Sequence, residues 1–407
     1  MRIAFITYEF PPDTGKGGIG TYTVQMAELL VDAGNEVHVF AGSHHREEKE
    51  RINGVTVYWV RCSGPESFRN KVVPVFQLVH KEEKIDIIEC CEIHGNALQV
   101  KIKYPELPLV VRLHAPNHLV ESLKKVYTPV ISKVRFFMGA LRRGRWDMGY
   151  WRTYDKAKDI DYQFVKYADH FTTPSDEMKN WVIENWKIPG FKIDVIPNPF
   201  KPSFSLLDIP VASGHPYKTI IFFGRLNVLK GLVNATKAIQ KILKNYPNWH
   251  FKIIGDDGDG PIPGGLSMKK WMLLHLKPYL ERVTFYNGVP YEDLPVLLCE
   301  GEIVLLPSLF ESFSYTCVEA MAAGKAVVGS ISGGMKNFIT DNKNGLLIDP
   351  NNHNDIFKSI ERLINDPKLC CSLSGKARDY IKYGVNNNDI VNNTLNAYKM
   401  CIEKRNG

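Results

Sequence analysis

Residues 302–324 read EIVLLPSLFESFSYTCVEAMAAG, and this stretch decides the fold that we predict for the chain. Glu302–Leu309 predicts a short buried strand, and Thr316–Gly324 predicts a helix that the glycine ends. Glu311 therefore lies in a strand-to-helix turn, and Glu319 lies inside the helix. Two acids near a helix start often only complement the helix dipole. The alternative is that both carboxylates accept hydrogen bonds from hydroxyl groups at the edge of an open α/β sheet.

The composition is that of a globular protein with room for two domains. The chain has 407 residues, of which 44% are hydrophobic and 23% charged. It contains no apolar run long enough to span a membrane, and the N-terminal MRIAFITYEF enters a strand without the layout of a signal peptide. The net charge of +7 is too modest to indicate nucleic acid as a partner. We therefore expect a cytoplasmic protein.

The eight cysteines are typical of reduced thiols in a cytosol. They include the adjacent pairs Cys90–Cys91 and Cys370–Cys371, and none of them forms a CxxC pair. Their spacing gives no support to a zinc site. We therefore expect no metal.

The first half begins with a strand, a glycine-rich turn, a helix and a second strand. These are predicted at Arg2–Thr7, Thr21–Val31 and Glu36–Phe40, and the turn holds Gly15, Gly17, Gly18 and Gly20. The glycines match G-x-G-x-x-G, but the motif does not follow the strand directly, and no acid that could bind a ribose ends the second strand. These two departures from the motif argue against the hypothesis of a nicotinamide-binding oxidoreductase. Small residues at a helix start can instead bring backbone N–H groups to an anion, or simply form a flexible loop.

Three further strands are predicted at Val55–Val60, Ile85–Cys90 and Leu109–Leu113. His114 follows the last of them, at the edge where open α/β sheets bind ligands. A single histidine is usually a hydrogen-bonded structural residue. Both roles therefore stay open for His114.

Lys124–Arg145 is strongly basic and contains no acid. Its cations are Lys124, Lys125, Lys133, Arg135, Arg142, Arg143 and Arg145. Apolar residues recur at helical spacing between them, although Pro129 and Gly139 interrupt the pattern. Such a segment can lie on an anionic membrane surface or bind an anionic partner. It can equally be a helix with a solvated basic face.

The second half repeats the alternation of strands and helices after a linker predicted at Phe200–Tyr217. Its strands are predicted at Lys218–Phe223, Trp249–Ile254, Val283–Tyr286, Glu302–Leu309, Ala326–Ser330 and Gly345–Ile348. The last helix is predicted at roughly Asp389–Lys404. Two sequential doubly wound units would face a cleft.

Cations and carboxylates recur at the strand ends of the second half. Arg225 and Lys230 follow one strand, and Glu311 and Glu319 follow another. Cations suit a diphosphate because they neutralise the charge of a departing group. Carboxylates suit a sugar or a ribose because each can accept several hydroxyl hydrogen bonds. Together these residues predict a nucleotide-sugar site.

Over nearly its whole length the chain resembles the GT-B fold glycosyltransferases of the large retaining family numbered four. The resemblance rests on the motifs GKGGIGTYT, VVRLHAP, ADHFTTPS, VIPNP, FFGRLNVLKG, IIGDDGDGP, LPSLFESFSYTCVEAMAAGKAVVGS and GLLIDP. It implies two Rossmann-like doubly wound parallel-sheet domains facing a cleft. Residues 1–200 would form the acceptor-side domain and residues 201–388 the donor-binding domain. The C-terminal helix, about 389–407, would pack back on the first domain.

The resemblance also implies a role for individual residues. Arg225 and Lys230 would hold the donor diphosphate, Glu311 the hydroxyls of the transferred sugar, and Glu319 the ribose. His114 would contact the sugar near the reacting carbon. The remaining donor-binding positions would be Gly17, Gly18, Gly288, Val289, Phe313, Ser314 and Tyr315. Ser314 stands where the family commonly has glycine, which leaves the identity of the donor sugar open.

The function that the resemblance implies is sugar transfer with retention of configuration. The donor would be a nucleotide-sugar, first a UDP-sugar and next a GDP-sugar. The acceptor would be a saccharide or a lipid-linked saccharide in cell-surface polysaccharide biosynthesis, with peripheral membrane contact through Lys124–Arg145. No cofactor or metal is expected. Asp257 and Asp259 spell DxD, a metal-binding motif in a different glycosyltransferase fold, but here they lie in a glycine-rich loop after a strand, which favours turn chemistry. A non-catalytic nucleotide-sugar-binding protein and a nucleotide-sugar epimerase are the alternatives.

Overall fold

The computed structural model describes residues 1–15, 17–149, 154–211, 215–262 and 265–406. The chain forms two compact units. Unit 1 comprises Met1–His118, Asp155–Lys201 and Asn386–Gly407, and unit 2 comprises Leu119–Tyr154 and Pro202–Val385. Each unit is therefore assembled from separate stretches of the sequence.

Unit 1 is built on an eight-stranded sheet in the order β3-β4-β2-β1-β5-β6-β7-β8. The strands are β1 Arg2–Thr7, β2 Glu36–Ser43, β3 Lys49–Ile52, β4 Val55–Arg61, β5 Ile87–Cys91, β6 Leu109–Arg112, β7 His170–Thr173 and β8 Ile193–Val195. All neighbours pair in parallel except β3, which runs antiparallel to β4 at one edge. The turns that follow β1, β5 and β6 therefore meet at one edge of the sheet.

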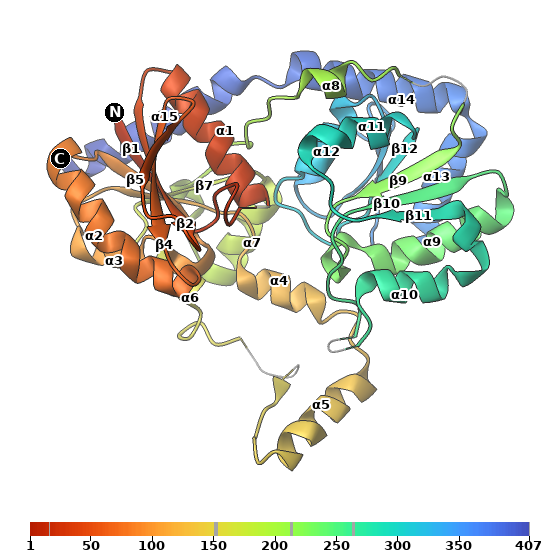
Figure 1. The fold of residues 1–407 in the computed structure, drawn as a ribbon, viewed down its shortest axis with the longest axis horizontal. Helices are drawn as coiled ribbons and strands as arrows, with labels where there is room; N and C mark the ends of the chain where they lie inside the picture. Colours follow the sequence, from red (N-terminus) through yellow and green to blue (C-terminus); the bar gives the residue numbers. More distant parts are fainter. Residues whose placement is uncertain (16, 150–153, 212–214, 263–264, 407) are drawn as a thin grey trace. The chain divides into compact units, whose positions relative to one another are not determined.

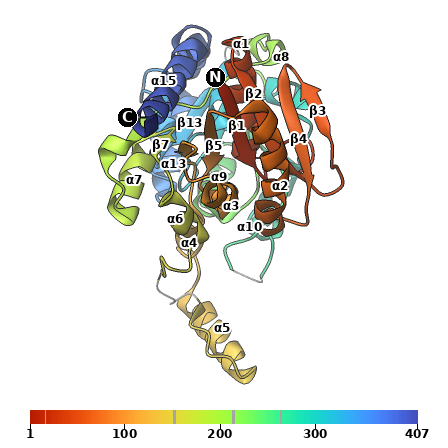
Figure 2. The same cartoon turned by 90° about the vertical axis from the view of Figure 1, so that its left-hand side faces the viewer.

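Helices cover both faces of this sheet (Figure 2). They are α1 Gly18–Asp32, α2 Pro65–Glu83, α3 Leu98–Lys103, α6 Ile160–Val165, α7 Asp176–Trp186 and α15 Asn387–Asn406. Helices α1 and α15 pack on one face, where Met26 and Tyr398 join strand residues such as Val39 in one apolar cluster. Helix α2 packs on the other face, where Phe76 contacts Phe40 at 5.3 Å between ring centroids. Alternating strand residues thus supply two buried layers.

Unit 2 is built on a six-stranded parallel sheet in the order β11-β10-β9-β12-β13-β14 (Figure 1). The strands are β9 Thr219–Phe223, β10 His250–Ile254, β11 Val283–Tyr286, β12 Ile303–Leu306, β13 Ala326–Ser330 and β14 Leu346–Ile348. Its helices are α5 Val130–Arg142, α8 Phe204–Leu207, α9 Leu232–Asn245, α10 Met268–His275, α11 Leu294–Cys299, α12 Tyr315–Ala322, α13 His353–Asn365 and α14 Pro367–Asp379. Helix α4 Asn117–Lys124 crosses from unit 1 into unit 2.

The prediction of two doubly wound parallel sheets is confirmed, and three local features differ from it. Leu119–Tyr154 belongs to unit 2, although the sequence placed it in a continuous first domain. Helix α5 runs through Gly139, because one glycine weakens a helix without ending it. The predicted linker contains α8, whose N-cap is Ser203; its residues 212–214 lie outside the described chain.

In the part of the chain that the structure describes, no helix is long and apolar enough to cross a bilayer. All eight cysteines are free, with Cys299 and Cys371 half-buried and the others buried.

Candidate functional site

The turn between β12 and α12 holds Glu311, and two polar side chains contact its carboxylate. Lys230 forms an ion pair with Glu311 Oε1, and the Ser308 hydroxyl donates to the same oxygen at 3.1 Å. The backbone carbonyl of Glu311 accepts from Gly334 N at 2.6 Å, which ties this turn to the one after β13. The structure thus brings Lys230 and Glu311 together, as their positions after neighbouring strands β9 and β12 predict.

The turn that follows β9 presents Lys230. The backbone amide of Lys230 donates to Asn227 Oδ1 at 3.2 Å, and the next residue, Gly231, has φ +69°. A Cβ at Gly231 would lie 1.8 Å from the carbonyl oxygen of Pro307, so only glycine fits there. Leu309 N donates to Leu229 O at 2.7 Å and joins this turn to the β12–α12 turn. A backbone hydrogen bond therefore holds the two turns that carry the cation and the carboxylate next to each other.

Arg225 lies in the same turn but is exposed, and within the described chain no hydrogen bond or ion pair engages its side chain. It lines a pocket of about 670 Å³ in unit 2. The other lining residues are Val120, Glu121, Lys124, Lys125, Asn227, Val228, Leu229 and residues 257–260. Asp257 accepts the backbone N–H groups of Gly258 and Lys269, each at 2.9 Å, which is turn chemistry. Among the described residues no cluster of acids, histidines and cysteines is arranged to hold a metal.

Ser314 is the N-cap of α12, which explains how a side chain fits where the family usually has glycine. Its hydroxyl accepts from Cys317 N at 3.3 Å and lies 3.0 Å from the Thr316 hydroxyl. Its φ of −107° requires no glycine. Phe313 and Tyr315 flank it with ring centroids 4.8 Å apart. The Ser314 side chain is therefore engaged by the helix end.

Glu319 lies one turn into α12 and is half-buried. Burial raises the pKa of its carboxyl to about 7. The pKa of the nearby Tyr291 phenol is raised to about 12, first by burial and then by the charge of Glu319. Glu319 can therefore change its charge near neutral pH.

Gly288 and Val289 follow β11 on the far side of β10. Gly288 N donates to Asp256 Oδ1 at 3.1 Å, and Asp256 itself follows β10. The two residues thus lie at the same carboxyl edge of the sheet as Arg225. Within the described chain, no hydrogen bond or ion pair joins them to Glu311 or Glu319.

In unit 1, Gly17 is the N-cap of α1, and Gly18 is its first residue. Gly17 makes no side-chain cap, and the first turn of α1 holds no acid, so backbone N–H groups at this helix start remain available to an anion. Gly17 has φ −128°, which any residue adopts, and the carboxylate of Glu9 would lie 3.7 Å from an added Cβ. Lys16 of the same motif lies outside the described residues.

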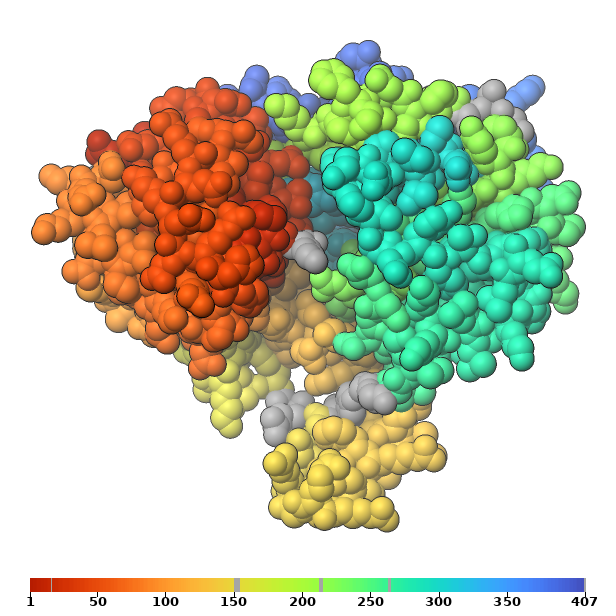
Figure 3. Space-filling model, viewed as in Figure 1, coloured from red at the N-terminus to blue at the C-terminus, as the bar shows by residue number. Residues whose placement is uncertain are grey.

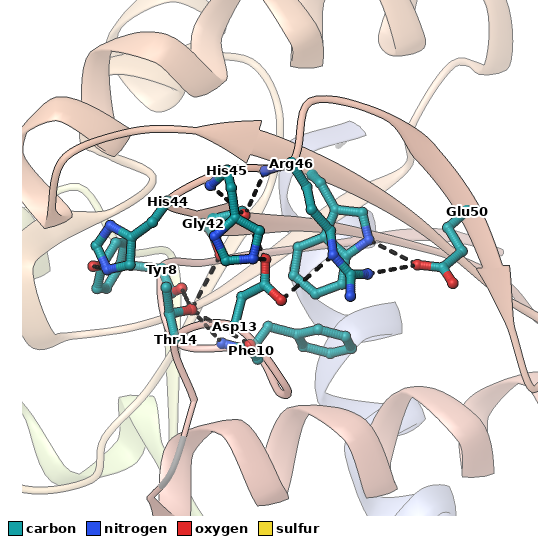
Figure 4. Close-up of polar contacts among 11 residues, drawn as sticks. Tyr8, Phe10, Asp13, Thr14, Gly42, His44, His45, Arg46 and Glu50 are labelled. Carbon is teal, nitrogen blue, oxygen red and sulfur yellow. Dashed lines mark hydrogen bonds and ion pairs between the residues drawn. The ribbon is translucent and has the colours of Figure 1, made fainter.

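Polar contacts to the end of β2 fix the loop that precedes α1 (Figure 4). The Thr14 hydroxyl lies 2.5 Å from the carbonyl oxygen of Tyr8 and 3.1 Å from that of Gly42. Asp13 accepts from the Ser43 hydroxyl and lies 3.5 Å from Arg46 Nε. These contacts therefore fix Asp13 and Thr14, the residues directly before the glycines of this motif.

His114 follows β6 and is 7% exposed. Its ring meets Tyr22 of α1 edge-on at 5.5 Å, and its Nε2 is buried with no hydrogen-bond partner among the described residues. Burial, and then the charge of Arg112, lower the pKa of the imidazole to about 3. The ring is therefore neutral at physiological pH and can exchange one hydrogen bond through Nε2.

Sequence reasoning missed three polar residues of these two regions. The Ser308 hydroxyl donates to the Glu311 oxygen that also pairs with Lys230. Near His114, Glu92 and Asp161 accept backbone N–H groups. The only signal for Glu92 is its place directly after β5, at the ligand-binding edge. Asp161 gives no signal, because it lies in a short helix far from His114 in the sequence.

Two family descriptions match the chain, one in each half. Residues 16–204 match "Glycosyltransferase Family 4", and residues 209–380 match "Glycosyl transferases group 1". Among curated relatives, an uncharacterised glycosyltransferase of Methanocaldococcus jannaschii is 26% identical, over 99% of this chain and 99% of its own. The D-inositol 3-phosphate glycosyltransferase of Corynebacterium jeikeium is 27% identical, over 91% and 90% respectively.

Solved structures share the fold at lower identity. Sucrose-phosphate synthase from Thermosynechococcus elongatus gives a TM-score of 0.70 at 19% identity and covers 99% of both chains. HepE of Anabaena, in complex with UDP-glucose, gives 0.66 at 18% identity over 98% of this chain and all of its own. These likenesses show the GT-B fold.

Proposed function

Because this chain belongs to the GT-B glycosyltransferases of family 4 and group 1, and is a glycosyltransferase, we propose that it transfers a sugar from a nucleotide-sugar donor to a saccharide or lipid-linked saccharide acceptor. Unit 2 would bind the donor and unit 1 the acceptor. A UDP-sugar is the first donor to test, because the HepE structures contain UDP and UDP-glucose. A GDP-sugar is the next. The acceptor would belong to cell-surface polysaccharide biosynthesis.

The observation that carries this proposal is the Lys230–Glu311 pair. A cation and a carboxylate held side by side can bind two different parts of the donor. Lys230, with the unengaged Arg225, would bind the diphosphate, while Glu311 accepts hydrogen bonds from the sugar hydroxyls. Glu319 would accept from the ribose, and Gly288 and Val289 would lie near the base. Backbone amides of Phe313, Ser314 and Tyr315 would add donors at the α12 start.

We propose that transfer retains the anomeric configuration and needs no metal ion. The bond between the anomeric carbon and the diphosphate oxygen breaks, and the acceptor oxygen bonds to the same face of that carbon. The departing diphosphate takes the acceptor proton, while Arg225 and Lys230 stabilise its charge. His114 would contact the sugar near the reacting carbon, and Gly17 and Gly18 would approach the phosphates.

Alanine substitution of Lys230 or Glu311 tests this site. We expect each change to lower transfer by at least about a hundredfold, because each removes a charge that the transition state needs. Nucleotide release from UDP-, GDP- and ADP-sugars measures the rate, and EDTA should leave it unchanged. Lys252, which forms an ion pair with Glu300 in the same unit, is the matched control. Lys252→Ala should keep the rate within about twofold, because its ion pair with the half-exposed Glu300 involves none of the proposed donor-binding residues. Near-normal rates in Lys230→Ala would contradict the assignment.

We also propose that Lys124–Arg145 contacts an anionic membrane surface. Large apolar side chains of this segment are exposed, among them Val130 at 70% and Ile131 at 61%. Figure 3 shows the segment in yellow, and its lysines and arginines surround these apolar residues in the sequence. Exposed apolar residues on a basic helix are typical of a helix that lies in a bilayer interface.

A further inference from the structure

Glu92 has a fully buried carboxyl group next to His114. It is 0% exposed and directly follows β5, and both of its oxygens lie within hydrogen-bond distance of His114 N, at 2.9 and 3.0 Å. The backbone N–H of Ala115 also contributes to the hydrogen bonding of this carboxylate. Glu92 therefore connects the turn after β5 with the turn after β6.

Asp161 of α6 braces the same two turns from the other side. It too is 0% exposed, and its oxygens accept from His94 N at 2.9 Å and from Asn117 N at 3.0 Å. His94 has φ +64°, a conformation that is unfavourable for a residue with a Cβ. Two buried carboxylates thus hold backbone amides on both sides of His114.

Neither carboxylate forms an ion pair with a lysine or arginine in the part of the chain that the structure describes. Burial raises the pKa of Glu92 to about 8; the His114 N–H opposes this rise, and the Asp161 charge adds to it. Burial likewise raises the pKa of Asp161. Placing two such groups together is unfavourable for stability. Their presence at these buried positions therefore points to a role that an apolar residue could not fill.

We propose that Glu92 is a positioning residue for sugar transfer: its carboxyl group holds the backbone amide of His114 and so fixes the position of the imidazole, whose Nε2 has no hydrogen-bond partner among the described residues. This inference rests on the proposed function, in which His114 contacts the sugar. Asp161 supports the same loop through His94 and Asn117. Glu92 itself touches no substrate and acts only through His114.

Kinetics of Glu92 and His114 variants test the proposal, with UDP-glucose, GDP-mannose and ADP-glucose as donor probes. We expect Glu92→Ala to lower kcat about tenfold or more, with donor KM changed less than about threefold. Glu92→Gln keeps one oxygen for His114 N–H and should retain more activity than Glu92→Ala. In a His114→Ala background, Glu92→Ala should cause no further loss, because the group it positions is gone. An equal loss in both backgrounds would overturn the proposal.

Glu302 is the matched control, since it is also a buried glutamate whose oxygens accept backbone N–H groups, those of residues 217–219. Glu302→Gln should lower Tm about as much as Glu92→Gln yet keep kcat within about twofold. Hydrogen exchange of peptides spanning residues 113–118 gives a readout without turnover. Faster exchange there in Glu92→Gln, and not in Glu302→Gln, is expected, and unchanged exchange overturns the inference. A wild type that cleaves no donor, or a fully active His114→Ala, would instead refute the proposed function.

Discussion

Glu319 has a carboxyl group whose charge should control donor binding near neutral pH. Burial raises its pKa to about 7, so the group is mostly neutral at pH 6 and mostly ionised at pH 8. An ionised carboxylate can accept hydrogen bonds from two ribose hydroxyls at once. Donor affinity should therefore rise about tenfold from pH 6 to pH 8, following the ionised fraction. Donor Kd measured by calorimetry across this range checks the prediction.

Glu319→Gln supplies the comparison for this pH dependence. The amide cannot ionise, so the Kd of the variant should stay flat over the range where the wild-type Kd changes. A wild-type Kd that does not vary with pH would show that Glu319 makes no contact with the donor in its charged form. The same pH dependence in Glu319→Gln would assign the titration to another group.

Single residues were predictable where their chemistry follows from strand order. Lys230 and Glu311 each follow a parallel strand, and the carboxyl ends of parallel strands share one edge, so their meeting could be anticipated. Glu92 and Asp161 could not be anticipated, because they bind backbone amides, which every residue has. No sequence pattern indicates which backbone amide will donate a hydrogen bond to a buried carboxyl group. The roles of Arg225, Gly288 and Val289 stay predictions.

At the scale of elements, α12 explains the serine that departs from the family pattern. Ser314 caps the helix through its hydroxyl, so Ser314→Ala should destabilise unit 2 by about 1 kcal/mol. For a unit of this size that loss lowers Tm by about 2–4 °C, which calorimetry can measure. Ser314→Gly should cost only a few tenths of a kcal/mol, because glycine is itself an acceptable N-cap.

The donor KM of the Ser314 variants separates a helix cap from a donor contact. Because the hydroxyl is engaged by Cys317 N, both variants should keep KM within about twofold. Ser267, which caps α10 in the same unit, is the matched control: Ser267→Ala should lose comparable stability. A tenfold change of KM in Ser314→Gly alone would mean that the hydroxyl faces the donor.

Strands and helices were predicted well where a short stretch of sequence carries the pattern that marks them. The strand from Val283 to Tyr286 and the strand from Ala326 to Ser330 have the predicted bounds, because short apolar runs between turns mark buried strands. Helix α8 was missed, since four residues are too few to show a period. Helix α1 begins earlier than predicted, at Gly18, because glycines at a helix start hide the first turn from propensity.

At the scale of the whole molecule, the family resemblance placed the C-terminal helix on the first domain, but no pattern in the sequence assigned Leu119–Tyr154 to unit 2. Unit 2 takes Leu119–Tyr154, and unit 1 takes Asn386–Gly407, so the chain passes between the units more than once. The buried hydroxyl of Tyr398 donates to Glu89, and Tyr127 accepts from Asn234 Nδ2 at 2.9 Å. Such pairings join residues that are distant in the sequence, where composition and periodicity give no signal.

Through the segment Lys124–Arg145, the protein should bind lipid vesicles that contain anionic lipid and should not bind neutral vesicles. In α5 the exposed residues Val130, Ile131, Val134, Met138 and Leu141 fall on one face at helical spacing, with basic residues beside them. Each cation near an anionic surface adds about 1 kcal/mol, and salt screens this attraction. Flotation with phosphatidylglycerol vesicles should therefore recover the protein at low salt and much less at high salt.

Ile131→Asp places a charge on the apolar face and should abolish flotation at every salt concentration, because it removes the burial that accompanies the electrostatic attraction. Leu274, which is 60% exposed on α10, is the matched control, and Leu274→Asp should float like the wild type. Charge reversal of Lys133 and Arg135 should weaken binding only at low salt, since that part of the affinity is electrostatic. A wild type that stays in the dense fraction at low salt would refute membrane contact, and equal flotation of Ile131→Asp would assign the binding to charge alone.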